Sequence, residues 1–430
     1  MLRRLALALL LLASTLRAAD PPAYLSAKDD SYAWKVVQEP ELNGITAAVI
    51  SMTSQTWRGI PWTHWMGIFR AKNCAHPQDA LLVVDGGSIR KDPPERISKE
   101  WLYLAALAER TGSTVAIVGQ VPNEPLFDGL KEDALIAYTF DHFLDDGDES
   151  WPCLLPMVKS AMRAMDTVQA FSEERFHTQV TRFVVAGASK RGWTTWLTGA
   201  TDPRVVAIAP LVIDTLNIPE QMRLQVRSFG TFSEEIGDYT KIDLPKRIAS
   251  ENGKRLLQMV DPYSYLDKYT MPKLIVLGTN DRYWPVDAVK LYFPDLPGEK
   301  YIHYVPNAGH GLGPGALEAV SAFYQTMLTG EQRPRFAWKT SREGGELRVV
   351  VTAEDQPVRV KTWTAQSKDR DFRDDTWTGA EVAEADGAWT GTLKLPVGSF
   401  SAIFVELTYE SSLGIEYTLT TNIEVAGDPE

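Results

Sequence analysis

The chain has 430 residues, 44% hydrophobic and 23% charged, a composition typical of an ordinary globular protein that excludes disorder, collagen-like repeats and coiled coils. Its 44 Lys and Arg against 56 Asp and Glu give a net charge of −12, which argues against nucleic acid as a partner because phosphate binding needs clustered basic residues. A chain of this length has room for two or three domains of roughly 150 residues each.

The first nineteen residues have the pattern of a secretion signal. Arg3 and Arg4 precede an unbroken apolar run over residues 5–13, and small residues stand before Asp20. Nine apolar residues are too few to span a bilayer core, and no later run reaches 18, so we expect no stable membrane insertion. The sequence predicts a signal peptide over residues 1–19 and a secreted or periplasmic protein, with a membrane anchor or a mitochondrial presequence as the alternative.

Residues 20–78 look irregular and β-leaning, with their best strand at 46–52. After them, short runs that are apolar on both faces alternate with longer amphipathic stretches. The runs predict strands over residues 80–84, 113–118, 182–186, 205–213, 273–278 and 301–305. The clearest helical spacing of apolar residues covers 154–171. Buried strands that alternate with helices predict a mostly parallel sheet flanked by helices on both sides.

Two changes of pattern divide the chain further. Residues of about 215–270 interrupt the alternation at a point that follows a strand, which is where a substrate-selecting cap or lid is commonly inserted. From residue 331 the helical signal stops and short alternating strands with Gly-rich turns begin. We therefore expect an α/β domain over residues 20–330 and an all-β sandwich over residues 331–430.

The two cysteines leave their state open. An exported protein could join Cys74 to Cys153 in a disulfide, but a chain with a large core does not require one, and two small buried thiols are the simpler outcome. Cys74 and His76 alone are too few ligands for zinc, so no metal site is expected. The sequence also lacks phosphate-binding and dinucleotide-binding glycine motifs, and we expect no cofactor.

The most informative segment runs from Arg182 to Trp193. An apolar strand leads directly into Gly187-Ala188-Ser189-Lys190-Arg191-Gly192 and then into a helical stretch. This layout is typical of a nucleophile elbow, although the usual motif, G-x-S-x-G, has its second glycine one residue earlier than Gly192. The simpler alternative is a serine that only caps a helix.

An activated serine requires a base and an acid later in the chain. Asp281 follows the strand at 273–278, and His310 lies between two glycines after the strand at 301–305. Asp214 and Asp287 are alternative acids, and His310 could instead be a surface histidine. Since each candidate follows a strand of one parallel sheet, the order favours a triad of Ser189, Asp281 and His310.

The remaining site residues are predicted from their neighbours. The backbone N–H of Lys190 and those of Gly86 and Gly87, which end the strand at 80–84, could hold an oxyanion, although the glycine pair could also be a plain turn. We predict substrate contacts from Arg191, Trp193 and Trp284, and the charge of Arg191 beside the nucleophile favours an anionic substrate. The mixed-charge run at 368–375 is predicted to be a solvated or interdomain loop.

The motifs together resemble the PhoPQ-activated pathogenicity-related protein family. The segments that carry the resemblance are residues 57–59, 82–87, 121–126, 132–138, 151–158, 187–193, 304–310 and 370–373. The resemblance implies an α/β-hydrolase fold with a Ser189, Asp281 and His310 triad. The elbow is also similar to that of glucuronoyl esterases.

These patterns predict an exported serine hydrolase that cleaves an ester or amide through an acyl-enzyme. A small molecule, a glycan ester or a peptide could be the substrate, and the oligomeric state is left open. The regulatory and virulence context in the family's name keeps an alternative, a secreted signalling or binding protein that retains a hydrolase scaffold without turnover.

Overall fold

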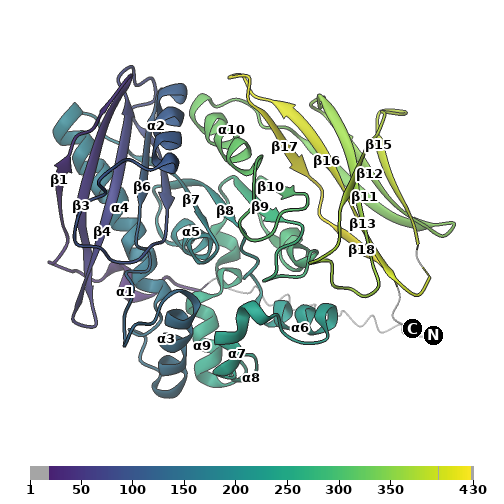
Figure 1. Cartoon of the computed structure of the whole chain (residues 1–430), viewed down its shortest axis with the longest axis horizontal. Helices are drawn as coiled ribbons and strands as arrows, with labels where there is room; N and C mark the ends of the chain where they lie inside the picture. The colour runs from purple at the N-terminus through teal and green to yellow at the C-terminus, as the bar shows by residue number, and fades with distance from the viewer. Residues whose placement is uncertain (1–18, 396, 428–430) are drawn as a thin grey trace, which may run out of the picture.

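A single mixed β-sheet of fifteen strands runs through the molecule, seen in a computed structural model that describes residues 19–395 and 397–427 (Figure 1). The predicted signal peptide, apart from Ala19, lies outside the described residues. Among the residues that are described, no helix has the length and apolar character needed to cross a membrane.

The order of the strands across this sheet is β1-β3-β4-β6-β5-β7-β8-β9-β10-β17-β16-β13-β14, with β2 beside β3 and β18 beside β16. The strands are β1 (Ala33–Gln38), β2 (Glu41–Leu42), β3 (Ile45–Trp57), β4 (Ile60–Ala71), β5 (Asp79–Val84), β6 (Thr114–Val118), β7 (Arg182–Ala188), β8 (Val205–Leu211), β9 (Lys273–Gly278), β10 (Lys300–Val305), β13 (Arg359–Ser367), β14 (Thr378–Glu381), β16 (Phe400–Glu410), β17 (Glu416–Thr420) and β18 (Glu424–Ala426).

The middle of the sheet is parallel. Strands β6, β5, β7, β8, β9 and β10 pair in parallel, and each overlaps one of the six strands predicted from apolar runs. Four of the six residues of β5 and all residues of β6 and β9 are buried, as helices on both faces require. The carboxyl ends of these strands therefore meet at one edge of the sheet.

The N-terminal region is more regular than its sequence suggests. Strands β3 and β4 are long and antiparallel, and β4 joins the parallel core through an antiparallel pairing with β6. Residues 60–71 gave no strand pattern because β4 is buried without interruption after Thr63, so its polar and apolar residues do not alternate.

Helices cover both faces of the sheet. Alternating residues of β7 divide between two apolar clusters: Phe183 and Val185 join α4 and α5 on one face, while Val184 and Ala186 join α2 and α10 on the other. The helices are α1 (Ala23–Ser26), α2 (Lys99–Thr111), α3 (Glu132–Asp146), α4 (Leu154–Phe176), α5 (Lys190–Thr201) and α10 (Ala316–Thr329). Helix α4 confirms the helix predicted at 154–171 and continues it by five residues.

The segment between β8 and β9 folds into short helices. These are α6 (Ile218–Phe229), η1 (Glu234–Ile236), α7 (Gly237–Lys241), α8 (Leu244–Arg247), α9 (Glu251–Val260) and η2 (Pro262–Lys268), and after β9 come η3 (Ala288–Leu291) and η4 (Phe293–Asp295). Helices α6 to α9 gather with α3 below the sheet in Figure 1. We call residues 214–272 the helical insertion.

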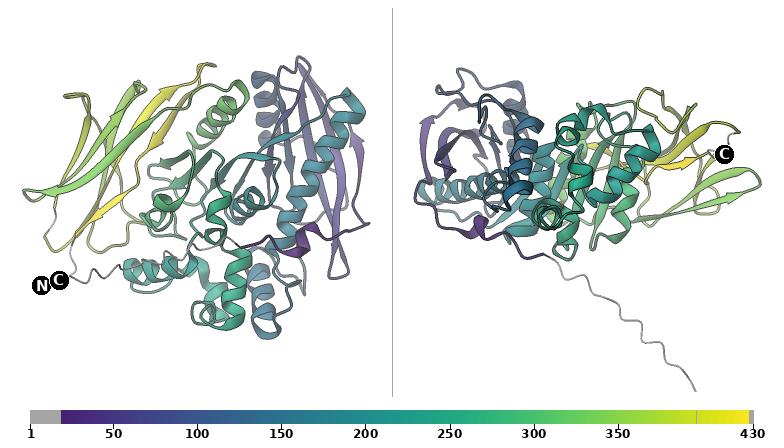
Figure 2. Two further views of the ribbon diagram at one scale, coloured as in Figure 1. Left: turned by 180° about the vertical axis from the view of Figure 1, so that it is seen from behind. Right: turned by 90° about the horizontal axis from the view of Figure 1, so that it is seen from below.

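The C-terminal strands extend the main sheet. An antiparallel pairing of β17 with β10, at Thr420 and Ile302, makes β17, β16, β13 and β14 continuous with the parallel core. A second, three-stranded sheet of β11 (Phe336–Glu343), β12 (Glu346–Ala353) and β15 (Trp389–Lys394) packs on β13 and β16. These two layers stand at the opposite end of the molecule from β1 to β4 (Figure 2).

Both cysteines are free thiols. Cys153 is fully buried directly before α4, and burial raises the pKa of its thiol. Of the two outcomes that the sequence left open, the structure therefore has separate thiols and no Cys74–Cys153 bridge.

Candidate active site

Ser189 is the single residue between β7 and α5, and its backbone is strained. Its φ of 58° and ψ of −128° lie outside the regions that side chains favour, which costs of order 1–3 kcal/mol. The Ser189 N–H donates to Leu211 O on neighbouring β8, at 2.8 Å, which holds the turn. Its hydroxyl makes no capping hydrogen bond to α5, so the alternative of a simple cap serine does not fit this turn.

Two glycines allow the turn because no side chain fits at either position. A Cβ on Gly187 would lie 2.6 Å from the carbonyl oxygen of Arg191, and one on Gly192 would lie 2.9 Å from that of Leu211. The second glycine of this elbow is thus needed at Gly192, where α5 crosses β8, which explains why the spacing departs from G-x-S-x-G.

Asp281 and His310 form a hydrogen-bonded pair. The Nδ1 atom of His310 lies 2.9 Å from Asp281 Oδ2 and 3.0 Å from Oδ1, and the backbone N–H of Tyr283 donates to Oδ1 at 2.9 Å. Asp281 is 6% exposed, so little solvent competes for the pair. The two residues follow adjacent strands β9 and β10, whereas Ser189 follows β7. Strand β8 lies between β7 and β9, so the strand that carries Ser189 is not adjacent to the strands that carry Asp281 and His310.

The Nε2 atom of His310 is buried and has no hydrogen-bond partner among the described residues. Ser189 and His310 nevertheless line the same pocket. In many enzymes the hydrogen bond between the nucleophile and its base forms only when substrate is bound. The absence of a Ser189–His310 hydrogen bond is therefore compatible with a catalytic pair.

The alternative acids have other partners. Asp214 is buried beside the Tyr292 hydroxyl, which donates to it, and burial raises the pKa of its carboxyl to about 7. Asp287 binds Lys290 and Arg370. Neither contacts His310, so the geometry favours Asp281.

The pocket beside Ser189 and His310 is small and apolar. Its volume is about 50 Å³, so the space next to the two side chains is narrow. The helical insertion supplies much of the lining, including Ile218, Met222 and Leu244. The two predicted tryptophans also line it: Trp193, tied to Val260 O through its indole N–H, and Trp284.

Sequence reasoning missed the polar residues at the edge of this pocket. Asp133, at the start of α3, accepts hydrogen bonds from the hydroxyls of Tyr239 and Tyr283, at 2.9 and 3.1 Å. The Tyr283 ring packs on the His310 ring with centroids 4.2 Å apart. Only the position of Tyr283, two residues after Asp281, could have singled it out.

The basic residues after Ser189 are engaged away from the pocket centre. Both guanidinium NH₂ groups of Arg191 donate to Glu132, at 2.8 and 2.9 Å, and its Nε donates to Val121 O. Arg191 is not among the residues that line the pocket, so the geometry does not support its predicted contact with an anionic substrate. Lys190 does line it, but its ammonium lies 2.7 Å from Glu132. Although burial opposes ionisation of Glu132, these two cations lower its pKa.

The structure does not support the oxyanion role predicted for Gly86 and Gly87. Neither glycine lines the pocket. A Cβ on Gly86 would lie 2.4 Å from an NH₂ nitrogen of Arg191, so the absence of a side chain at Gly86 makes space for that guanidinium.

We expect Arg191→Ala to destabilise the fold by about 2–3 kcal/mol. The change removes one of the two cations that bind Glu132, together with the hydrogen bond to Val121 O. The loss is smaller than for a fully buried pair, because Lys190 still binds Glu132 and the Glu132 side chain is 42% exposed. Urea unfolding measures it, with Arg223→Ala, whose pair with Glu220 is exposed, as the control. An unchanged midpoint together with a selective loss of activity on anionic esters would restore the substrate-binding role.

Comparison with known proteins agrees with the resemblance seen in the motifs. Residues 22–373 match the family described as PhoPQ-activated pathogenicity-related protein. Autocrine proliferation repressor protein A of Dictyostelium discoideum is 32% identical over 466 residues, which cover 99% of this chain and 94% of that protein.

Two solved structures share the fold. An acetyl xylan esterase from Paenibacillus sp. R4 aligns over 71% of this chain and 91% of its own, with a TM-score of 0.51 and 16% identity. Acetyl xylan esterase 1 from Thermoanaerobacterium sp. JW/SL YS485 aligns over the same shares, with a TM-score of 0.50 and 17% identity. At these identities the likeness shows an α/β-hydrolase-like fold.

Proposed function

Because this chain belongs to the PhoPQ-activated pathogenicity-related protein family, we propose that it is an exported serine esterase with a Ser189, His310 and Asp281 triad. The observation that carries the proposal is that His310, paired with Asp281, lines the same pocket as a serine on a strained strand-to-helix turn. Export rests on the predicted signal peptide at 1–19.

In the proposed reaction, Ser189 Oγ attacks the ester carbonyl carbon while His310 Nε2 takes its proton. Asp281 keeps the imidazole oriented through Nδ1 and stabilises the imidazolium that forms. When the tetrahedral intermediate collapses, the bond from carbonyl carbon to leaving oxygen breaks, and His310 returns the proton to that alkoxide. Water then attacks the acyl-Ser189 ester while His310 takes its proton. The bond from the acyl carbon to Ser189 Oγ breaks, His310 returns the proton to that oxygen, and the carboxylic acid is released.

The developing oxyanion is proposed to bind the amino end of α5. The Lys190 N–H opens this helix, where backbone N–H groups have no partner within the helix and the helix dipole favours negative charge. No second donor is assigned, since Gly86 and Gly87 lie outside the pocket.

We propose that the substrate is an ester with a small apolar acyl group. The narrow pocket, about 50 Å³ in volume, favours a short acyl group, and its apolar lining disfavours a charged one. The fold shared with two acetyl xylan esterases supports an acetylated carbohydrate as the first substrate to try.

The test of this function combines covalent labelling with turnover. The mature protein should react with a fluorophosphonate probe, with mass spectrometry placing the label on Ser189, and should hydrolyse aryl acetate faster than aryl octanoate. His310→Ala should lose the labelling, while His76→Ala, at a half-buried histidine outside the pocket, should keep it. A folded wild type that neither labels nor turns over these esters would refute the proposal.

A signalling protein without turnover is the second candidate. The specific observation in its favour is the relative of 32% identity, a protein whose name describes repression of proliferation. On this reading Ser189 would be unreactive, so the same labelling experiment separates the two functions.

A further inference from the structure

The mixed-charge run predicted as a solvated or interdomain loop reaches the loops that carry Asp281 and His310. It belongs to the connection between β13 and β14 in the C-terminal part of the main sheet. Phe372 is 1% exposed and Trp377 is 2% exposed, so both ends of the segment 372–377 are anchored in the core. We call residues 371–377 the clamp segment.

The clamp segment holds the residue before Asp281. The side-chain amide of Asn280 lies within hydrogen-bonding distance of the carbonyl oxygens of Phe372, Arg373 and Asp375, at 3.2, 3.2 and 2.7 Å. Since the acceptors are backbone atoms of an anchored segment, the contact fixes the position of the acid loop relative to the C-terminal sheet.

The same segment holds the loop of the base. The side-chain amide of Asn307, three residues before His310, pairs with the backbone of Trp377: its Nδ2 donates to the carbonyl oxygen at 3.0 Å and its Oδ1 accepts from the N–H at 2.7 Å. The acid and base loops also touch directly, because the Asn307 N–H donates to Thr279 Oγ1 at 2.8 Å. Both loops are therefore supported from one side by a single segment.

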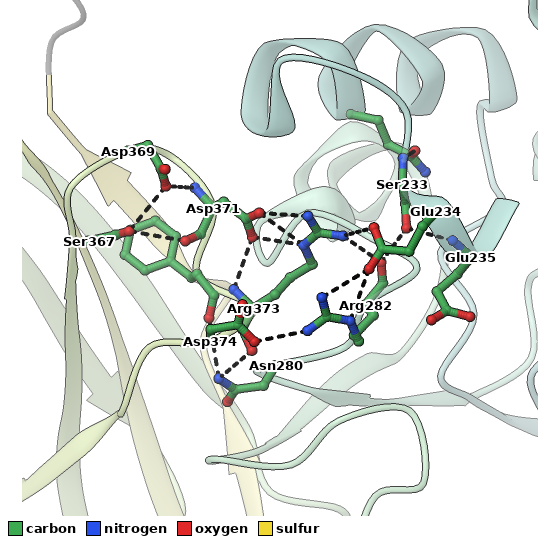
Figure 3. Close-up of polar contacts among 12 residues, drawn as sticks. Ser233, Glu234, Glu235, Asn280, Arg282, Ser367, Asp369, Asp371, Arg373 and Asp374 are labelled. Carbon is green, nitrogen blue, oxygen red and sulfur yellow. Dashed lines mark hydrogen bonds and ion pairs between the residues drawn. The ribbon is translucent and has the colours of Figure 1, made fainter. Parts of the chain in front are cut away.

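The residue after Asp281 enters an ionic cluster with the clamp segment and the helical insertion (Figure 3). Arg282 and Arg373 both bind Glu234, at 2.9 and 2.8 Å, and Arg282 also binds Asp374 at 2.9 Å. Asp371 holds the Arg373 guanidinium in place through paired contacts at 2.7 and 2.8 Å. A backbone hydrogen bond and the two arginines lower the pKa of Glu234 to about 2, so Glu234 is ionised at neutral pH.

Arg373 is the centre of this arrangement. Its side chain is 13% exposed, and its guanidinium lies 4.0 Å from the centroid of the Phe229 ring at the end of α6. The cluster thus joins the acid loop, the C-terminal sheet and the insertion that lines the pocket. Its best sheltered pair is Arg373 with Asp371, whose side chains are 13% and 25% exposed, whereas Glu234 and Asp374 are 54% and 88% exposed. Since exposed pairs contribute little, Arg373 is the member whose loss should matter most.

We propose that Arg373 is a positioning residue for the Asp281–His310 pair, acting through the clamp segment. This inference rests on the proposed esterase function. It gives the C-terminal strands a part in catalysis: Asn280 and Arg282, on either side of Asp281, and Asn307, beside the base, are all held by residues 371–377. A displacement of about 1 Å in such a pair can lower a rate by up to roughly a hundredfold.

The experiment compares Arg373→Ala with Arg348→Ala, a control that removes an arginine–glutamate pair away from the clamp segment, between Arg348 and Glu346 on β12. Turnover of aryl acetate is divided by the fraction of protein that reacts with a fluorophosphonate probe, which gives kcat per active site. We expect Arg373→Ala to lower this kcat roughly ten- to hundredfold with KM changed less than about threefold. The control should leave both unchanged.

A second measurement shows whether the effect passes through Asp281. In an Asp281→Asn background, where the pair is already impaired, Arg373→Ala should slow probe labelling no further, whereas independent effects would add. Glu234→Gln, at a side chain with 54% exposure, weakens both arginine contacts without opening the core and should lower kcat several-fold.

The outcomes are distinct. An active wild type whose Arg373→Ala and Glu234→Gln variants keep kcat per active site overturns this inference alone. A fall only in the reactive fraction does the same, because it indicates a structural role. A wild type that neither labels nor turns over overturns the esterase function and this inference with it.

Discussion

Replacement of Ser189 by alanine is expected to lower kcat for ester hydrolysis by about 10⁵–10⁶-fold, with little change in KM. Removal of a triad nucleophile elsewhere costs about this much, because the acyl-enzyme path is closed and only the surroundings of the site assist water. The strained backbone of Ser189 supports the expectation, because backbone strain lowers stability and is found mostly at functional sites.

The measurement is kcat and KM on an aryl acetate, with Ser88→Ala as the matched control. Ser88 is exposed and follows the glycine pair that lies outside the pocket, so its variant should behave as wild type. If the Ser189→Ala protein keeps most of its activity, Ser189 is not the nucleophile and a different group performs the reaction. Thermal unfolding should show no loss of stability, because alanine removes a hydroxyl for which no hydrogen bond is assigned.

The parallel core and the site loops could be predicted because their signals are local. A strand buried on both faces is a short apolar run, and the residues that end it lie at the carboxyl edge of the sheet by construction. Knowledge of β7, β9 and β10 was therefore enough to bring Ser189 and His310 to one edge. Strand β4 could not be predicted in this way, because its buried stretch includes the polar residues His64 and Arg70, which interrupt the apolar run.

The features that could not be predicted depend on the direction of side chains and on contacts between residues far apart in the sequence. Arg191 follows Ser189 by two residues, and residues two apart point to different sides of a helix, so closeness in sequence did not place its charge in the pocket. Asp133 meets Tyr283 across 150 residues, and no pattern in either segment indicates the other. The charged run at 368–375 has no periodicity, and only the packing of Phe372 and Trp377 turns it toward the acid loop.

Asp281→Asn should lower kcat by about 10³–10⁴-fold, whereas Asp214→Asn should leave it within about threefold. The asparagine amide would oppose the tautomer in which Nδ1 carries the proton, and it could not stabilise an imidazolium. Asp214 bonds to Tyr292, and burial raises its pKa to about 7, so it is poorly suited to stay ionised beside a base. Because both variants exchange a buried carboxyl for its amide, the pair controls for volume. Equal losses, or a larger loss at Asp214, would reassign the acid and move the site toward Tyr292.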